Sequence, residues 1–404
     1  MNIHEQTSLR QRLQTIQLEI IEGLGREMGE VVTPKLERLV HILDWVRIEQ
    51  FVNDGCGVGR PPRDRFAIAN AFVAKVVLNL PTTVALIDRL KVDRTLRRIC
   101  GFGVYRKLPD ESIFSRVFAE FTNQRLAERV HEALIKEQLG DHLIGHISRD
   151  GTAITAREKP KSKSVEVIPA LPIDAQQNKG QKAADHTEVT PREAYQAAPK
   201  QNGAGIIKLR RGRPRKGELR KPKELTRIAR QRQQGLAVML EELPKECDRG
   251  TKCNAQGYKF SWNGYKLHLD TADCGVPISA ILTSASVHDS QVAVPLSRLS
   301  AHRVTNLYDV MDAAYCSEEL RQYSRSLGHI PLIDHNARGS AKIDFAPHEA
   351  NRYKERTVAE RMNARLKSEF GAENLWVRTP EKVMSHLMFS VLVLSADQLM
   401  RLLQ

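Results

Sequence analysis

The feature that most limits the fold of this chain is the alternation of apolar and polar residues in His142–Ala156. A period of two residues is typical of a β-strand with one buried face. The next segments with this alternation begin only at Gly257, after a long stretch of different composition. We therefore expect an α/β domain in which two or three later strands follow the first one in an antiparallel run.

The later strand segments are short and bounded by turn residues. Tyr258–Asp273 reads as two strands that meet at Asn263–Gly264, because Asn-Gly is the strongest short signal for a hairpin. A Gly-Val-Pro turn then leads into a strand at Ile278–Val287. Two more strands are predicted at Val304–Val310 and His329–Asp334.

Residues 1–140 carry the signals of an all-helical domain. Pro61 and Pro62 open an apolar, Ala-rich run, as at the entry to a buried helix. Pro109 and an N-cap at Asp110 precede a short helix that is a candidate recognition helix of a helix-turn-helix. The arginines of this region either grip DNA or only solubilise a packing domain, and charge alone favours neither. Further helices are predicted at Leu9–Met28, Lys35–Phe51, Thr82–Leu90, Arg94–Ile99, Ser112–Phe121, Glu224–Leu243 and Trp376–Leu403, the last one amphipathic and packed on the sheet.

A basic stretch separates the first strand from the later ones. Residues 157–250 are rich in Lys, Arg, Gln, Pro and Gly, and Lys159–Ala204 looks disordered. Lys208–Arg232 holds about twelve Lys or Arg against two Glu, which is typical of a phosphate-binding segment. Its Arg-Gly-Arg-Pro resembles the core of an AT-hook, although a basic linker without base preference explains it slightly better. The candidate DNA-binding residues here are Arg211, Arg213, Arg215 and Lys216.

Net charge, cysteines and hydropathy exclude several classes of protein. The formal charge of +14 predicts an anionic partner, while 5% aromatic residues argue against a surface that stacks many single-stranded bases. Six cysteines without a CxxC pair read as reduced thiols, and Cys247 and Cys253 are too isolated to predict a zinc site. No signal peptide is recognisable, and the apolar run Met384–Leu394 is too short to span a bilayer. We expect a cytoplasmic protein.

Two aspartates occupy unusual places on the predicted strands. Asp150 interrupts the first strand, where Asp is unfavourable, so Asp150–Gly151 is either the tip of a hairpin or a residue kept for chemistry. Asp312 follows the strand Val304–Val310, at the end where open α/β sheets place their ligands. A helix cap is the plainer role for Asp312, and Asp309 is a rival on the same strand.

The segment Asn351–Phe370 reads as one helix, because it lacks Gly and Pro and is rich in helix-forming residues. Tyr353, Arg356, Glu360 and Lys367 then fall within about 60° of one helix face. An ordinary i,i+4 ion pair between Arg356 and Glu360 explains this face as well. A lone carboxylate among donors also suits a residue that holds a metal beside phosphate oxygens.

These four residues supply a resemblance to a known family. The spacing Tyr-x2-Arg-x3-Glu-x6-Lys resembles the YREK signature of bacterial insertion-sequence transposases with a DDE catalytic triad. The resemblance implies an RNase H-like mixed sheet with flanking helices, preceded by an all-helical N-terminal domain. The implied domains are 1–140, which binds DNA, and 141–404, which is catalytic and interrupted by a partly disordered insertion at 157–250. The implied catalytic and metal-binding residues are Asp150, Asp312 and Glu360.

The resemblance also implies a reaction. Two Mg²⁺ ions, or Mn²⁺ in their place, would serve DNA strand cleavage and strand transfer at the ends of the element. Tyr353, Arg356 and Lys367 would hold the DNA strand, and the expected partners are double-stranded DNA and a second copy of the chain, with no membrane. The alternatives are an RNase H-like nuclease that does not transpose and a catalytically silent DNA-binding repressor.

One departure from the family lies in the position of the additional segment. Well-known members carry a large β insertion between the second Asp and the Glu, whereas here the extra segment follows Asp150. A cleavage pathway that depends on a base-stacking Trp of that insertion is therefore not implied. Trp262 is a candidate for such stacking, but core packing is its expected role.

Overall fold

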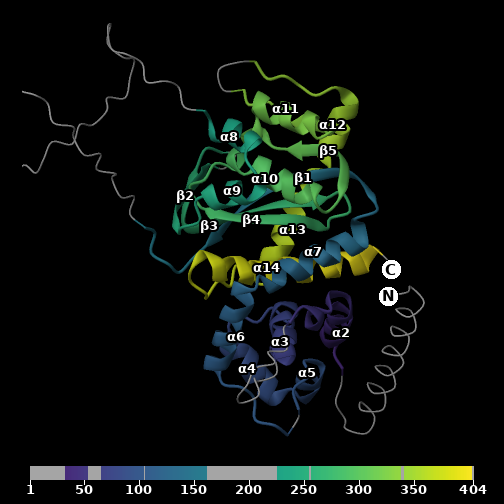
Figure 1. Cartoon of the computed structure of the whole chain (residues 1–404), viewed down its shortest axis with the longest axis vertical. Coiled ribbons are helices and arrows are strands. Elements are labelled where there is room, and N and C mark those ends of the chain that lie inside the picture. Colours follow the sequence, from purple (N-terminus) through teal and green to yellow (C-terminus); the bar gives the residue numbers. More distant parts are fainter. Residues whose placement is uncertain are drawn as a thin grey trace, which may run out of the picture. The chain divides into compact units, whose positions relative to one another are not determined.

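The computed structural model describes residues 32–52, 65–103, 105–161, 225–253, 256–337 and 341–402 (Figure 1). All of these fall within one unit of the chain, to which residues 162–224 do not belong. The predicted helix Leu9–Met28 and the Arg-Gly-Arg-Pro segment lie outside the described residues. The same holds for the candidate DNA-binding residues Arg211, Arg213, Arg215 and Lys216.

The described residues form a six-stranded mixed sheet of the RNase H-like class. The strand order is β4-β3-β1-β5-β6, with β2 paired to β3. β1 pairs antiparallel with β3 and parallel with β5, β3 pairs antiparallel with β2 and β4, and β5 runs parallel to β6. The strands are β1 (Leu143–Thr155), β2 (Asp248–Cys253), β3 (Lys259–Ala272), β4 (Pro277–Ser284), β5 (Thr305–Met311) and β6 (Ile330–Ile333).

The structure excludes two turns that local sequence allows, one an open alternative and one a prediction. Asp150 is not the tip of a hairpin, because β1 continues past it and Asp150 lies opposite Leu269 of β3. The predicted hairpin at Asn263–Gly264 is also wrong, since β3 runs unbroken through both residues. Gly264 has a φ of +150°, and a Cβ there would lie 2.2 Å from the carbonyl oxygen of Ile154. This Gly therefore permits a close approach of two strands instead of a reversal of the chain.

Helices fill the N-terminal region, as the sequence predicts. α4 and α5 begin where Thr82 and Asp93 cap them, each side chain accepting a hydrogen bond from a backbone N–H three residues on. The rings of Phe114, Phe118 and Phe121, all from α6, pack around Phe72 of α3. The elements are α2 (Pro34–Val46), η1 (Ile48–Phe51), α3 (Arg65–Val77), α4 (Thr83–Val92), α5 (Arg94–Ile99), α6 (Glu111–Asn123) and α7 (Leu126–Leu139).

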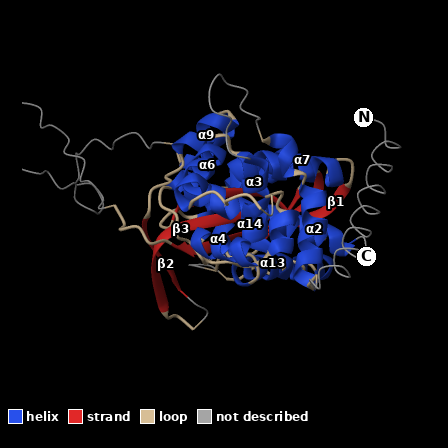
Figure 2. Ribbon diagram, turned by 90° about the horizontal axis from the view of Figure 1, so that it is seen from below, coloured by secondary structure: helices blue, strands red, loops and turns tan. Residues whose placement is uncertain are grey.

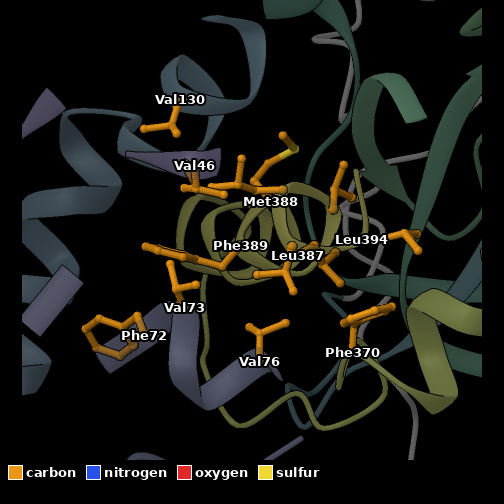
Figure 3. Close-up of a cluster of buried hydrophobic side chains, with 14 of the residues drawn as sticks. Val46, Phe72, Val73, Val76, Val130, Phe370, Leu387, Met388, Phe389 and Leu394 are labelled. Atoms are coloured by element: carbon orange, nitrogen blue, oxygen red, sulfur yellow. The ribbon is translucent and has the colours of Figure 1, made fainter. Parts of the chain in front are cut away.

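The last helix, α14 (Pro380–Leu402), is the centre of the largest hydrophobic cluster. It contacts α2, α3, α6 and α7 as well as strand β4. In Figure 3, Leu387, Met388, Phe389 and Leu394 of α14 lie among side chains from the N-terminal helices. The expectation of an amphipathic helix is wrong, because α14 is buried on all sides along most of its length. One core thus joins the helical region to the sheet.

By length and composition α14 is also apolar enough to cross a membrane. However, 83% of its most apolar window is buried inside the protein. This burial is the environment of a core helix in a folded protein. It explains the apolar run Met384–Leu394 without a membrane.

The remaining helices lie on the two faces of the sheet. α10 (Ala293–Ala301) and α13 (Thr357–Ser368) cover opposite faces of the sheet. Arg149 of β1 bonds Asp270, which also bonds Ser300 of α10. The next residue, Asp150, points to the other face and bonds Asn363 of α13. The predicted helix Glu224–Leu243 is two helices, interrupted at Gln234–Gly235. The other elements are α8 (Arg227–Gln233), α9 (Leu236–Glu242), η2 (Asp289–Gln291), η3 (Ala313–Tyr315), α11 (Glu318–Ser326) and α12 (Pro347–Lys354).

The expected single helix Asn351–Phe370 is wrong. α12 ends at Lys354 and α13 begins at Thr357. Between them the backbone bonds span three residues instead of four, and the Thr357 hydroxyl donates to the carbonyl oxygen of Lys354. Two β-branched residues, Thr357 and Val358, follow the break and lower local helix propensity. The break separates Tyr353 from the helix that carries Glu360 and Lys367.

Candidate active site

Asp150 lies in the middle of the sheet, on the face covered by α13. Its Oδ2 accepts a hydrogen bond from Asn363 Nδ2 at 2.9 Å. Burial and the negative charge of Asp312 raise the pKa of Asp150 to about 6. The ionised form of Asp150 is therefore less stable than that of an ordinary Asp, and a bound cation would stabilise it.

Asp312 follows directly after β5 and caps η3, its Oδ1 accepting from the Ala314 N–H at 2.9 Å. Arg149 of β1 is the register partner of Met311 of β5, so the two parallel strands carry Asp150 and Asp312 at matching positions. Burial raises the pKa of Asp312, and the charge of Asp289 adds to the rise. The structure therefore brings the two aspartates of the sequence analysis together in the middle of the sheet, beside the carboxyl end of β5.

Glu360 stands apart from this pair. Its Oε1 accepts from Arg356 Nη2 at 2.5 Å, and the Glu360 side chain is 52% exposed. Within the described ranges, no three acidic, His or Cys side chains lie close enough to hold a metal ion. Glu360 nevertheless lies one turn before Asn363, which bonds Asp150, so α13 places the glutamate near the aspartates without joining them.

Cationic side chains surround the two aspartates. The positive charges of Lys252 and Arg356 oppose the rise in pKa of both Asp150 and Asp312. Burial lowers the pKa of Lys367, an effect that Glu373 and Asp150 partly offset. Carboxylates and cations are thus interspersed around the two aspartates, and cations of this kind bind phosphate oxygens.

Tyr353 remains beside Arg356 across the helix break. The Arg356 guanidinium lies 5.9 Å from the centre of the Tyr353 ring, which packs at 4.8 Å against the ring of Phe345. Burial raises the pKa of Tyr353 to about 12, so its hydroxyl keeps its proton at neutral pH. Tyr353 is therefore a hydrogen-bond donor at the margin of the site.

From the sequence, His288 and Asp289 are expected to cap the helix that begins at Ser290, and the structure confirms this for His288 but not for Asp289. The cap of η2 is His288, whose Nδ1 accepts from the Ser290 N–H. Asp289 pairs instead with Lys266 Nζ at 2.9 Å and lies 3.6 Å from His268 Nδ1. A Cβ at Gly151 would lie 2.9 Å from Asp289 Oδ1, so only Gly beside Asp150 leaves room for this carboxylate. The one sequence signal for a role of Asp289 in the site was its position just after a predicted strand.

Asn363 was also missed. Its position three residues after Glu360, on the same side of a helix, was the one signal in the sequence. Trp262, in contrast, behaves as expected: it is 6% exposed, and its Nε1 donates to the Tyr265 carbonyl oxygen at 3.0 Å. Cys247 and Cys253 are free thiols, like the other cysteines in the described part of the chain.

Two family models match the chain. Residues 242–395 match the model described as "Transposase DDE domain", and residues 28–120 match "Transposase domain (DUF772)". Residues 242–395 are therefore similar to a transposase DDE domain. The match to this domain includes Asp312 and Glu360 but begins after Asp150. No curated protein and no solved structure is significantly similar to the chain.

The carboxylates of Asp150, Asp312 and Glu360 fit a divalent cation in part. Asp150 and Asp312 offer hard oxygen ligands, and their raised pKa values reflect a negative charge that a cation would relieve. Glu360 also offers a carboxylate ligand, but its Oε1 accepts a hydrogen bond from Arg356. Metal binding by all three acids therefore requires Glu360 to exchange its partner.

Proposed function

We propose that this chain is the transposase of a bacterial insertion sequence and that it cleaves and joins DNA at the ends of the element. The observation that carries the proposal is the pairing of Asp150 with Asp312 on parallel strands of a sheet of the RNase H-like class. Asp312 also lies in the segment that matches a transposase DDE domain. Two carboxylates with raised pKa values, close to the cations Lys252 and Arg356, suit phosphoryl transfer.

Asp150, Asp312 and Glu360 would hold Mg²⁺ or Mn²⁺. Such ions, when bound, activate a water or a 3′-hydroxyl and stabilise the leaving oxygen. Arg356 would connect the binding of DNA to the third acid, because its guanidinium bonds Glu360. A DNA phosphate that takes Arg356 as its partner would free Glu360 to turn toward the aspartates.

DNA binding would draw on two sets of basic residues. Tyr353, Arg356 and Lys367 would hold the strand near the scissile phosphate. Residues 1–140 and the basic residues Arg211, Arg213, Arg215 and Lys216 would bind the duplex farther away. Two ends must be cut in concert, so the working form would be a homodimer on double-stranded DNA, in the bacterial cytoplasm and associated with the nucleoid.

The test uses the purified full chain, Mg²⁺ and DNA that carries the inverted repeats flanking the gene. We expect strand cleavage at the repeat ends and joining to a target duplex, and we expect Asp312→Asn to bind this DNA but cut nothing. Cleavage without preference for the ends and without joining would support a nuclease instead. Tight binding without cleavage by the wild type would support a repressor.

A further inference from the structure

The last turn of α13 is hydrogen-bonded to the helical N-terminal region. Asn79, which follows α3, donates from its Nδ2 to the carbonyl oxygen of Ser368, the last residue of α13, at 2.9 Å. Carbonyl groups at the end of a helix have no partner within that helix, so a side chain from outside can complete them. This bond joins residues that are 289 positions apart in the chain. The helix that carries Glu360 and Asn363 thus ends on a residue of the helical region.

The Asn79 side chain contacts the end of α13 through both atoms of its amide. Its Oδ1 accepts from Asn374 Nδ2 at 3.4 Å, in the loop after α13. A Cβ at Gly371, in the same loop, would lie 3.1 Å from that oxygen, so Gly leaves room for it. The backbone of Asn79 has a φ of +52°, a conformation that Gly adopts without cost and other residues rarely adopt. The position therefore combines backbone strain with a side chain that contacts another element, and this combination indicates a role beyond ending α3.

A buried carboxylate makes a second link between the two regions. Asp397 of α14, 3% exposed, accepts from Arg38 Nε of α2 and from Arg365 Nη2 of α13, at 2.6 Å each. The same two guanidinium groups lie 5.4 and 5.6 Å from the centre of the Phe370 ring, just after α13. α14 contacts α2, α3 and α13, and Figure 2 shows these three helices around α14. The helical region therefore holds the last turn of α13 through α2 as well as through the residue after α3.

These contacts bear on the candidate active site because a short helix moves as a rigid body. At about 1.5 Å per residue, Ser368 lies only about 12 Å along α13 from Glu360, and Asn363, which bonds Asp150, lies between them. The other end of α13 is separated from α12 by the break after Lys354. The contacts of the last turn therefore contribute to where Glu360 and Asn363 lie relative to Asp150.

We propose that Asn79 and Arg38 are positioning residues for DNA cleavage. Through the last turn of α13 they set the position of Glu360 and Asn363 beside Asp150. This inference rests on the proposed function and goes beyond it, because it gives the helical region a part in cutting DNA as well as in binding it. Loss of either contact should slow cleavage without weakening the binding of DNA.

The first variant, in the full chain, is Asn79→Gly. Gly relieves the positive φ while the bond to Ser368 is lost, so the melting temperature should stay close to that of the wild type. We expect kcat for Mg²⁺-dependent cleavage of end DNA to fall roughly tenfold, with KM and the affinity for this DNA in EDTA unchanged. Thr379→Gly is the matched control. Thr379 has a φ of +74° and an exposed side chain in the loop before α14, and its variant should cut like the wild type.

The second variant removes the other link. Arg38→Met leaves Asp397 paired with Arg365 and Arg401, at 2.6 and 3.0 Å, so the buried carboxylate keeps cationic partners. The same fall in kcat at constant KM is expected. Arg38→Lys keeps a cation on α2 and should restore most of the rate. Because Met and Lys have stems of similar length, a difference between these two variants reports the ion pair and not the packing.

Hydrogen exchange gives a readout that does not depend on activity. Without DNA or metal, backbone amides in the last two turns of α13 should exchange roughly fivefold faster in Asn79→Gly, while those of α3 exchange as in the wild type. Equal acceleration in both helices would overturn the inference, and so would wild-type kcat in both Asn79→Gly and Arg38→Met. A loss of DNA affinity that matches the loss of cleavage would also overturn it, because Asn79 would then bind DNA directly. Failure of the proposed function is seen separately, as a wild type that does not cut the ends.

Discussion

The two faces of strand β1 treat buried charge in opposite ways. On the α10 face, Arg149 makes two hydrogen bonds to Asp270, at 2.7 and 2.8 Å, and Ser300 donates a third at 2.6 Å. On the α13 face, the next residue, Asp150, has Asn363 as its hydrogen-bond partner and Asp312 as a neighbour of like charge. On the α10 face the buried Asp270 carboxylate is paired with a cation, whereas on the α13 face the Asp150 carboxylate has no ion-pair partner among the described residues.

Buried polar atoms without a hydrogen-bond partner include His268 Nδ1 on the α10 face, but more of them lie on the α13 face. Within the described residues, both ring nitrogens of His146, the hydroxyl of Ser148 and the Oδ1 of Asn363 are buried without a hydrogen-bond partner. Buried groups of this kind are unusual in a native fold and collect where a ligand or water completes them. The comparison indicates that the ion pair on the α10 face stabilises the fold, while the polar groups on the α13 face are available to bind a ligand.

The largest expected effect comes from removing one partner of the buried ion pair on the α10 face. Arg149→Met leaves Asp270 charged and buried without its partner, so we expect a loss of about 3–5 kcal/mol in the free energy of unfolding. Urea unfolding of the full chain measures it. The double variant Arg149→Met, Asp270→Leu removes both charges and should recover most of the loss. Equal destabilisation by the single and double variants would show that the pair contributes packing alone.

Removing the Asp150 charge from the α13 face should instead increase the free energy of unfolding. The pKa of Asp150 is about 6 in the folded protein and 3.8 for an ordinary Asp, so the wild type loses stability as the pH rises between these values. Asp150→Asn should therefore be about 2 kcal/mol more stable at neutral pH, allowing for partial exposure, and no more stable below pH 3.8. Thermal unfolding across this pH range tests the sign.

The same variant tests metal binding without an activity assay. Mg²⁺ should raise the melting temperature of the wild type, because a bound cation relieves the repulsion between Asp150 and Asp312. Asp150→Asn should show a much smaller rise. Equal shifts in both proteins would place the cation elsewhere.

A smaller effect is expected from Asn363. Asn363→Asp replaces the donor to Asp150 with another carboxylate, which should raise the pKa of Asp150 further. The acidic limb of the pH profile for cleavage should move up by roughly one unit. Asn363→Ala removes the hydrogen bond without adding charge and should move the limb less. Identical profiles for the two variants would mean that Asn363 acts through packing.

The smallest effect on stability is expected from the exposed pair on α13. Glu360→Gln removes an i,i+4 ion pair, so the free energy of unfolding should change by less than about 0.5 kcal/mol. Chemical denaturation is the measurement. A loss of several kcal/mol would show that Glu360 has a structural role that its exposure does not suggest.

The sequence predicted those features that depend on local pattern. The alternation around Asp150 and the position of Asp312 after a strand are visible in a few neighbouring residues, and the structure places both as expected. Local pattern also misled at Asn263–Gly264, where pairing of β3 with β1 and β2 outweighed a strong turn signal. The break between α12 and α13 depends on hydrogen bonds that no periodicity reveals.

The contacts that complete the site could not be predicted for a different reason. Asn363 and Asp150 are 213 residues apart in the chain. The pairing of Asp289 with Lys266 likewise depends on the register of β3 and on the space that Gly151 leaves. Such contacts follow from the packing of α13 and η2 on the sheet, and a single sequence carries no direct signal of that packing.

The central claim is that Glu360 completes a catalytic centre with Asp150 and Asp312, and α13 offers a matched control. Arg365 and Glu369 form a second i,i+4 pair at 3.0 Å on the same helix. The most direct measurement compares Mg²⁺-dependent strand cleavage at the element ends by Glu360→Gln and Glu369→Gln. The account predicts that Glu360→Gln binds the DNA but does not cut it, while Glu369→Gln cuts like the wild type. Equal cleavage by both variants would contradict it and leave Glu360 as one partner in a surface ion pair.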